Sequence, residues 1–186
     1  MPDVVAIEQA PSHNIAMPWY SAGFSVVPIQ ANGTKAPTRD WTTLQKNRMS
    51  QSEVEWSWRP GQPVGVALIC GNVSGYVEMT ELEGLATDAE SLEKIQKECA
   101  LRNVQEVWDH LLHQGYAEWT PSGGLHLIYR LADHAVPSNS KIALRPATDF
   151  ELNDEERRIR SAAPERVFWR TLAETRGEGG YVIVAP

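Results

Sequence analysis

Short apolar runs bounded by turn-forming residues recur along the chain and predict β-strands. Val64–Ile69 is apolar throughout, which is typical of a buried strand, and the turn residues Gly71 and Asn72 follow it. Several later strands are joined by tight turns, which favours antiparallel pairing. The predicted strands are Phe24–Ile29, Val64–Ile69, Tyr76–Glu83, Ala117–Thr120, Leu125–Arg130, Leu172–Arg176 and Tyr181–Val184.

Apolar residues recur at helical spacing over Thr87–His113 and predict two helices broken near residues 101–103. Their expected core positions are Leu92, Ile95, Val104, Val107, Leu111 and Leu112. Shorter helices are predicted at Ile15–Ala22, Trp41–Asn47, Gln51–Trp58 and Asp154–Ala162. Ser50 and Asn153 are the expected N-caps of the last two, and the rest of residues 131–165 predicts no strand. The pattern therefore favours an α+β fold with a largely antiparallel sheet over a doubly wound one.

The length of 186 residues suits one compact domain, which can contain two small lobes. The net charge of −7 argues against a protein that binds nucleic-acid phosphates over its whole surface. Residues 1–140 hold 9 Lys and Arg against 16 Asp and Glu, whereas residues 141–176 hold 8 against 7. A polyanion is therefore expected at the later third, where Trp169 beside Arg170 is the tryptophan to test for stacking on a template base.

No apolar run approaches the roughly 18 residues that span a bilayer, and residues 1–16 lack the basic and apolar segments of a signal peptide. We therefore expect a soluble protein of the cytoplasm. Cys70 and Cys99 are too few for a disulfide framework or a structural zinc site, and both are expected to be buried thiols.

Two glutamates end one of the predicted strands. Because side chains alternate along a strand, Glu81 and Glu83 share a face with the apolar Val77 and Met79, whereas Glu78 belongs to the other face. Residues two apart on a strand are separated by about 6.5–7 Å, so both carboxylates can reach a pair of metal ions about 3.5–4 Å apart. The alternative is a strand end in solvent with ordinary surface glutamates.

Ser122, Gly123 and Gly124 form a tight turn before His126. Two consecutive glycines allow the backbone to approach a phosphate closely, and the turn would offer it unpaired N–H groups as well as the Ser122 hydroxyl. The ring of His126 can donate a hydrogen bond to an anionic oxygen. The alternative is a plain hairpin turn followed by a core histidine.

Glu174 lies near the end of what we predict to be one arm of a hairpin, where it can complete the metal site. Arg176, two residues later on the same face, can hold Glu174 or contact phosphate. An exposed ion pair without function is the alternative for these two. Lys35 lies in a Gly-Thr-Lys-Ala-Pro loop, where it either reaches a phosphate or remains solvated.

Four ordered motifs resemble the bifunctional primase/polymerase domain of plasmid and phage replication proteins, within the archaeo-eukaryotic primase superfamily, and above all its actinobacteriophage versions. The motifs are Lys35-Ala36-Pro37 followed by Trp41, Val64–Gly71 before the carboxylate strand, Thr120–His126, and Glu174–Pro186. The resemblance covers nearly all of residues 1–186, which we take as a single primase/polymerase domain.

The resemblance implies a primase-like catalytic core in which a sheet similar to that of RNA-recognition domains carries the active site and a smaller α/β lobe packs on it. Glu81, Glu83 and Glu174 would hold Mg²⁺ or Mn²⁺, whereas Ser122 and His126 would contact the incoming triphosphate. Most members have aspartates where this chain has three glutamates. Since a glutamate is one methylene longer, we expect lower efficiency or a stronger dependence on Mn²⁺.

The implied reaction is template-dependent nucleotidyl transfer in phage or plasmid DNA replication. A primer 3′-hydroxyl, or a first nucleotide, would attack the α-phosphorus of an NTP or dNTP. The implied partners are a DNA template and primer and a replicative helicase, fused or separate, inside a bacterial host cell, and no membrane. The chain stops at Ala185-Pro186, where members usually continue, so we expect a shortened chain or a naturally short form.

Two other interpretations remain open. The chain could be a catalytically weak nucleic-acid-binding module that positions a helicase, with the three glutamates as a remnant. It could also be a nuclease that uses the same carboxylates with a metal ion.

Overall fold

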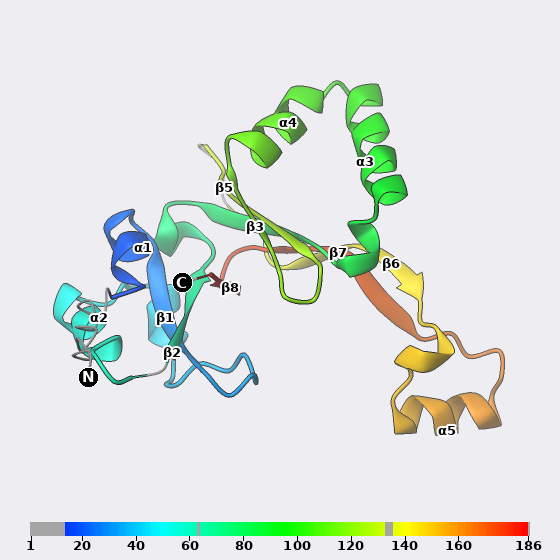
Figure 1. The fold of residues 1–186 in the computed structure, drawn as a ribbon, viewed down its shortest axis with the longest axis horizontal. Coiled ribbons are helices and arrows are strands. Elements are labelled where there is room, and N and C mark those ends of the chain that lie inside the picture. The colour runs from blue at the N-terminus through cyan, green and yellow to red at the C-terminus, as the bar shows by residue number, and fades with distance from the viewer. Residues whose placement is uncertain (1–13, 63, 133–135, 186) are drawn as a thin grey trace, which may run out of the picture.

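The computed structural model describes residues 14–62, 64–132 and 136–185 (Figure 1). Its helices are α1 (Met17–Ser21), α2 (Gln51–Ser57), α3 (Ala89–Leu101), α4 (Gln105–His113) and α5 (Asp154–Ala162). Its strands are β1 (Ser25–Gln30), β2 (Val64–Ile69), β3 (Val77–Leu82), β4 (Tyr116–Trp119), β5 (Leu125–Arg130), β6 (Ser140–Pro146), β7 (Trp169–Arg176) and β8 (Tyr181–Val184).

The strands form two sheets. One sheet has three strands in the order β1-β2-β8, and the other has five in the order β4-β5-β3-β7-β6. Every pairing between these strands is antiparallel. The fold is therefore α+β, as the tight turns predicted.

The predicted caps are present at two helices. Ser50 accepts a hydrogen bond from the Glu53 amide at the start of α2, and the Glu53 carboxylate reaches back to the Ser50 amide. Asn153 and Glu156 form the same reciprocal pair at the start of α5. These side chains satisfy amides that a helix leaves unpaired at its first turn, so they set where both helices begin.

The three-stranded sheet lies in the main apolar core. Val27, Leu68 and Ile69 have no exposed surface. The cluster that buries them includes Val54 of α2 and Met79 of β3, so one core joins the two sheets. The apolar run Val64–Ile69 is thus a buried strand, as predicted.

The five-stranded sheet has two different faces. On one face, Leu82, Leu125 and Leu127 pack against the helices α3 and α4, which lie over β3 and β5 in Figure 1. The helix residues in this contact are Leu92, Ile95, Trp108 and Leu112. Val104 and Val107, also predicted for the core, are 43% and 58% exposed. The prediction was wrong for these two because Trp108 and Leu112, four residues apart, form the stripe by which α4 packs.

The second half of the chain departs from prediction in two places. The strand β6 was not predicted, because it lies in a largely polar segment interrupted by prolines, and its pairing with β7 contains register shifts. The predicted hairpin between β7 and β8 does not exist. β8 pairs with β2 instead, and residues 177–180 carry the chain from the five-stranded to the three-stranded sheet.

The crossing between the sheets is held by hydrogen bonds that backbone amides donate. The Gly177 amide donates to Asn139 Oδ1 at 2.9 Å, and the Glu178 amide donates to the Pro137 carbonyl at 2.7 Å. The Cys70 amide donates to the Gly180 carbonyl at 2.9 Å. The turn therefore serves as a junction between sheets rather than as the tip of a hairpin. In the described part of the chain, no helix is long and apolar enough to cross a membrane.

Candidate active site

A row of polar side chains crosses the five-stranded sheet, one from each of four neighbouring strands. Glu118 of β4 lies opposite His126 of β5, His126 lies opposite Glu81 of β3, and Glu81 lies opposite Glu174 of β7. Residues directly opposite each other in antiparallel strands point to the same face. We call these four residues the polar row.

The polar row lies where an apolar face ends. Val77, Met79 and Ile128, on the same face, belong to the core shared with the three-stranded sheet. Two residues further along, the strands carry Glu81 and His126. The four side chains of the row are only 11–16% exposed. Charged groups this far from water need partners, because an unpaired charge there is costly.

His126 is held between two carboxylates. Its Nδ1 lies 3.0 Å from Glu118 Oε1, and its Nε2 lies 3.3 Å from Glu81 Oε1. Burial alone would lower the pKa of His126, but the hydrogen bonds to Glu118 and Glu81 and their charges raise it to about 9. The same contact with His126 lowers the pKa of Glu81. At neutral pH the site therefore holds an imidazolium that donates from both nitrogens.

Glu118 is a member of the row that was not predicted. Its Oε2 accepts hydrogen bonds from the Tyr116 hydroxyl at 2.8 Å and from the Ala185 amide at 3.0 Å. Burial raises the pKa of Glu118, but the bonds from His126, Ala185 and Tyr116 outweigh it and lower the pKa. The two strands and the tight turn between them were predicted, so counting residues across the turn would have placed Glu118 opposite His126.

Glu83 lies beyond the end of β3 and lines a different cleft from Glu81. It lines a cleft of about 590 Å³ together with Leu85, Arg145 and Arg170, among others. Burial and the neighbouring negative charges of Glu81 and Glu174 raise the pKa of Glu83. The three carboxylates are therefore close enough to repel one another.

Glu174 forms an ion pair with Arg176, two residues along the same strand. In the described ranges, no group of three or more His, Cys, Asp or Glu side chains is arranged so that it could hold a metal ion. In this arrangement the Glu174 carboxylate is paired with Arg176. The metal site formed by Glu81, Glu83 and Glu174 stays a prediction.

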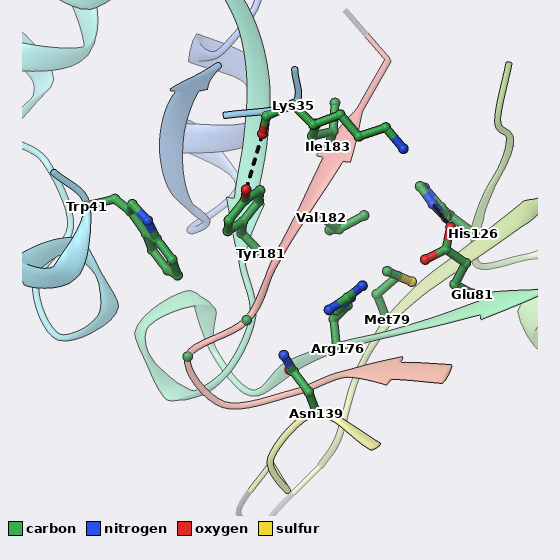
Figure 2. Close-up of a pocket in the computed structure, with 12 residues that line it drawn as sticks. Lys35, Trp41, Met79, Glu81, His126, Asn139, Arg176, Tyr181, Val182 and Ile183 are labelled. Carbon is green, nitrogen blue, oxygen red and sulfur yellow. Dashed lines mark hydrogen bonds and ion pairs between the residues drawn. The ribbon is translucent and has the colours of Figure 1, made fainter. Parts of the chain in front are cut away.

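A cleft of about 330 Å³ opens beside the polar row (Figure 2). Lys35, Glu81, His126 and Arg176 line its charged part. Figure 2 shows the side chain of Lys35 extending toward His126. The structure thus brings together four of the predicted site residues that come from separate motifs.

The opposite part of this cleft is aromatic and apolar. The rings of Trp41 and Tyr181 meet edge to face with their centroids 5.0 Å apart, and Val182 and Ile183 of β8 continue the wall. The Tyr181 hydroxyl donates to the Lys35 carbonyl at 3.1 Å, and Lys35 has a positive φ of 60°. This contact holds the loop of Lys35 against the three-stranded sheet. The backbone of Lys35 there has a conformation that residues other than glycine rarely adopt.

In the turn of Ser122, Gly123 and Gly124, the amides of both glycines are already hydrogen-bonded. The Gly123 amide donates to the Thr120 carbonyl at 2.9 Å, and the Gly124 amide donates to Thr120 Oγ1 at 2.9 Å. The prediction of unpaired N–H groups at the two glycines was wrong, because the turn closes on itself. The Ser122 hydroxyl lies 3.0 Å from Thr120 Oγ1.

The turn packs beside the segment that follows β3. Thr87 Oγ1 lies 2.8 Å from the Gly123 carbonyl, and a Cβ on Gly124 would lie 2.8 Å from the Leu82 carbonyl and 3.7 Å from the Glu83 Cα. A side chain at Gly124 would therefore collide with the end of β3. These contacts place the turn beside Glu83, at the end of β3.

Comparison with known families gives one match. A family model described as "Bifunctional DNA primase/polymerase, N-terminal" matches residues 16–186. The matched residues include both sheets, the whole polar row and both clefts. Among curated proteins, none matches the chain.

Proposed function

The chain belongs to the bifunctional DNA primase/polymerase family, and we propose that it transfers nucleotides onto a growing strand along a DNA template at the polar row. The single observation that carries this proposal is the cleft beside the row, in which Lys35, His126 and Arg176 surround Glu81. A triphosphate is a polyanion, and a cleft with three cationic side chains suits it. The volume of about 330 Å³ lies within the range of small-molecule sites.

In this proposal the triphosphate lies toward the charged part of the cleft, and the nucleoside lies toward Trp41 and Tyr181. Aromatic faces stack on sugars and bases without reading their sequence. Lys35 and Arg176 would pair with phosphate oxygens. His126, held as an imidazolium, would donate from Nε2 to an anionic oxygen.

The proposed chemistry is attack by a 3′-hydroxyl oxygen on the α-phosphorus of the nucleotide. The hydroxyl loses its proton to water as the new oxygen–phosphorus bond forms, the bond to the bridging oxygen breaks, and pyrophosphate leaves with its electron pair. Cations at the phosphates stabilise the charge that develops on the leaving group. The Ser122 hydroxyl is a further proposed phosphate contact, but Gly123 and Gly124 could serve only by close approach, since their amides are already bonded.

Glu81, Glu83 and Glu174 are the residues that would hold Mg²⁺ or Mn²⁺. The raised pKa of Glu83, caused by burial and by Glu81 and Glu174, is the observation that supports this, because a divalent cation would relieve the repulsion. Metal ions bound by such carboxylates lower the pKa of an attacking hydroxyl and neutralise phosphate charge. Arg176 would compensate the charge of Glu174 before any cation binds and could pair with phosphate afterwards.

The biological setting that we propose is the replication of phage or plasmid DNA in a bacterial cell, with a replicative helicase, fused or separate, as a partner. This part rests on the family and not on the site.

The test is incorporation of labelled dNTPs or NTPs on a primed and on an unprimed single-stranded template, with Mg²⁺ or Mn²⁺. We expect template-dependent incorporation, stronger with Mn²⁺. No incorporation with either metal and any nucleotide would refute the proposal. Template binding alone would then favour the helicase-positioning module, whereas template degradation without nucleotides would favour the nuclease.

A further inference from the structure

We propose that Glu118 is a positioning residue for nucleotide binding, which orients the ring of His126 so that Nε2 faces the nucleotide cleft. The proposal rests on the proposed function for its effect on nucleotides. Its structural part, the orientation of the ring, can be tested without any nucleotide.

The Glu118 carboxylate is held by three different segments. Oε1 lies 3.0 Å from Nδ1 of His126 on β5, whereas Oε2 accepts from the Tyr116 hydroxyl at 2.8 Å on β4 and from the Ala185 amide at 3.0 Å after β8. The side chain is 13% exposed. With both oxygens engaged and little access to water, the carboxylate has a fixed position from which to hold the ring.

Fixing one ring nitrogen of a histidine determines what the other can do. Since Nδ1 of His126 faces Glu118, Nε2 is the nitrogen that faces Glu81, 3.3 Å away. Glu81 and His126 both line the cleft, whereas Glu118 lies behind His126 as its neighbour on β4. Glu118 therefore acts through His126 and not by contact with a ligand.

The contact with Ala185 gives Glu118 a second link to the same cleft. Ala185 follows β8, whose Tyr181, Val182 and Ile183 line the aromatic part. One carboxylate thus connects the charged part of the cleft, through His126, with the end of the strand that forms the opposite wall. If Glu118 acted only through Ala185, its removal would disturb the aromatic part of the cleft whether or not His126 is present. If Glu118 positions His126, its removal should matter only when His126 is present.

A double-mutant cycle with His126 tests the proposal. The dissociation constant of a dNTP with Mg²⁺, and KM and kcat for incorporation, would be measured for Glu118→Ala, His126→Ala and the double variant. We expect Glu118→Ala to weaken dNTP binding and raise KM by about tenfold, with a smaller effect on kcat. In the His126→Ala background the second change should have no further effect, because the group that it orients is gone.

Two results of the cycle would overturn the proposal. The first is an unchanged dissociation constant in Glu118→Ala. The second is an equal loss with and without His126, which would assign Glu118 to the link with Ala185 alone. Glu118→Gln covers the case in which the alanine variant does not fold, since its amide oxygen can still accept from Nδ1–H and should restore part of the affinity.

The matched control is Glu78→Gln. Glu78 is a buried carboxylate of the same sheet that accepts from a tyrosine, Tyr129, at 2.7 Å, but it points to the face opposite His126. We expect this variant to bind dNTP like the wild type. A loss equal to that of Glu118→Gln would show a general effect of removing a buried carboxylate and would overturn the positioning role.

The orientation of the ring is tested by NMR of the imidazole nitrogens in the protein without nucleotide, with the signals of His126 assigned by their loss in His126→Ala. Glu118→Gln should shift the Nδ1 signal, and an unchanged signal would overturn the proposal. If the wild type neither binds nor incorporates nucleotides while this shift is present, the proposed function fails but the contact between Glu118 and His126 stands.

Discussion

The two sheets of this protein are built from similar strands but differ in what they contribute, since one forms the apolar core and the other carries the charged residues of the site. In the three-stranded sheet, β1 and β2 are apolar along nearly their whole length and lie in the core. In the five-stranded sheet, β3 begins in the same core with Val77 and Met79 and then presents Glu81 on the same face. The three-stranded sheet supplies the apolar side of the nucleotide cleft, and the five-stranded sheet supplies charged residues on the other side.

The difference shows how a charged site can lie next to an apolar core. The polar row is tolerated because each charge has a partner: His126 lies between Glu81 and Glu118, and Glu174 pairs with Arg176. The three-stranded sheet buries mainly apolar side chains, and the hydroxyl of its buried Ser25 donates to the Leu44 carbonyl at 2.9 Å. Stability and chemistry are therefore expected to respond to different substitutions.

The largest expected effect is on chemistry. Glu81→Gln combined with Glu83→Gln should reduce incorporation at least about a thousandfold, or about 4 kcal/mol of activation free energy, because both proposed metal carboxylates are lost. The melting temperature should fall only modestly, because the loss of the Glu81 charge, which His126 favours in the folded protein, is partly offset by the loss of the Glu83 charge, which burial disfavours. Primer extension and thermal unfolding are the two measurements. Glu90→Gln combined with Glu93→Gln, on the exposed surface of α3, is the control for the loss of two charges. Retained activity in the variant of Glu81 and Glu83 would place the metal site elsewhere.

The converse substitution removes stability and leaves chemistry intact. Leu68 of β2 has no exposed surface, so Leu68→Ala leaves a cavity in the core. The substitution should lower the free energy of unfolding by about 2–5 kcal/mol. Denaturant unfolding measures this loss. Incorporation per folded molecule, measured well below the melting temperature, should equal that of the wild type. A parallel loss of activity in the folded variant would show that the two sheets are not separable in this way.

The polar row should also make stability depend on pH. The folded pKa of His126, about 9, lies above its ordinary value of 6.5, so the stabilisation from His126 is fully present below about pH 6.5 and is lost as the pH rises through 9. This amounts to on the order of 3 kcal/mol. We expect the unfolding free energy of the wild type to fall over this interval more steeply than that of His126→Gln, with no metal added. Equal slopes for the two proteins would contradict the raised pKa.

The smallest effect is expected outside both clefts. Trp169 is 55% exposed at the start of β7, beside Arg170, and is predicted to stack on a base of the template. Trp169→Ala should weaken binding of single-stranded DNA about fivefold, close to 1 kcal/mol, and leave the KM for nucleotides unchanged. Fluorescence anisotropy with a labelled oligonucleotide measures the first, and Trp56→Ala, another exposed tryptophan, is the control. Equal binding by both variants would remove the stacking role.

Local signals in the sequence predicted most of the elements. The bounds of β2, β5, β8 and α5 agree with the structure, because an apolar run, a turn or an N-cap marks each end. The strand β6 carried no such signal. Its apolar residues Ile142 and Leu144 remain exposed, and its place in the sheet is set by pairing with β7 across an irregular register. Local sequence propensity does not predict a strand that is stabilised mainly by pairing with its neighbouring strand.

What the sequence determined by itself was therefore local: where strands and helices begin, that Glu81 shares a face with Val77 and Met79, and that Glu78 does not. Only the tertiary structure decided which strands are neighbours. It placed the pair of Glu118 and His126 in one row with Glu81 and Glu174, paired β8 with the other sheet, and brought Tyr181 to Lys35, 146 residues away in sequence. Alternation along a strand is a property of one chain segment, whereas register and sheet order depend on burying the whole apolar surface at once, which no single segment encodes.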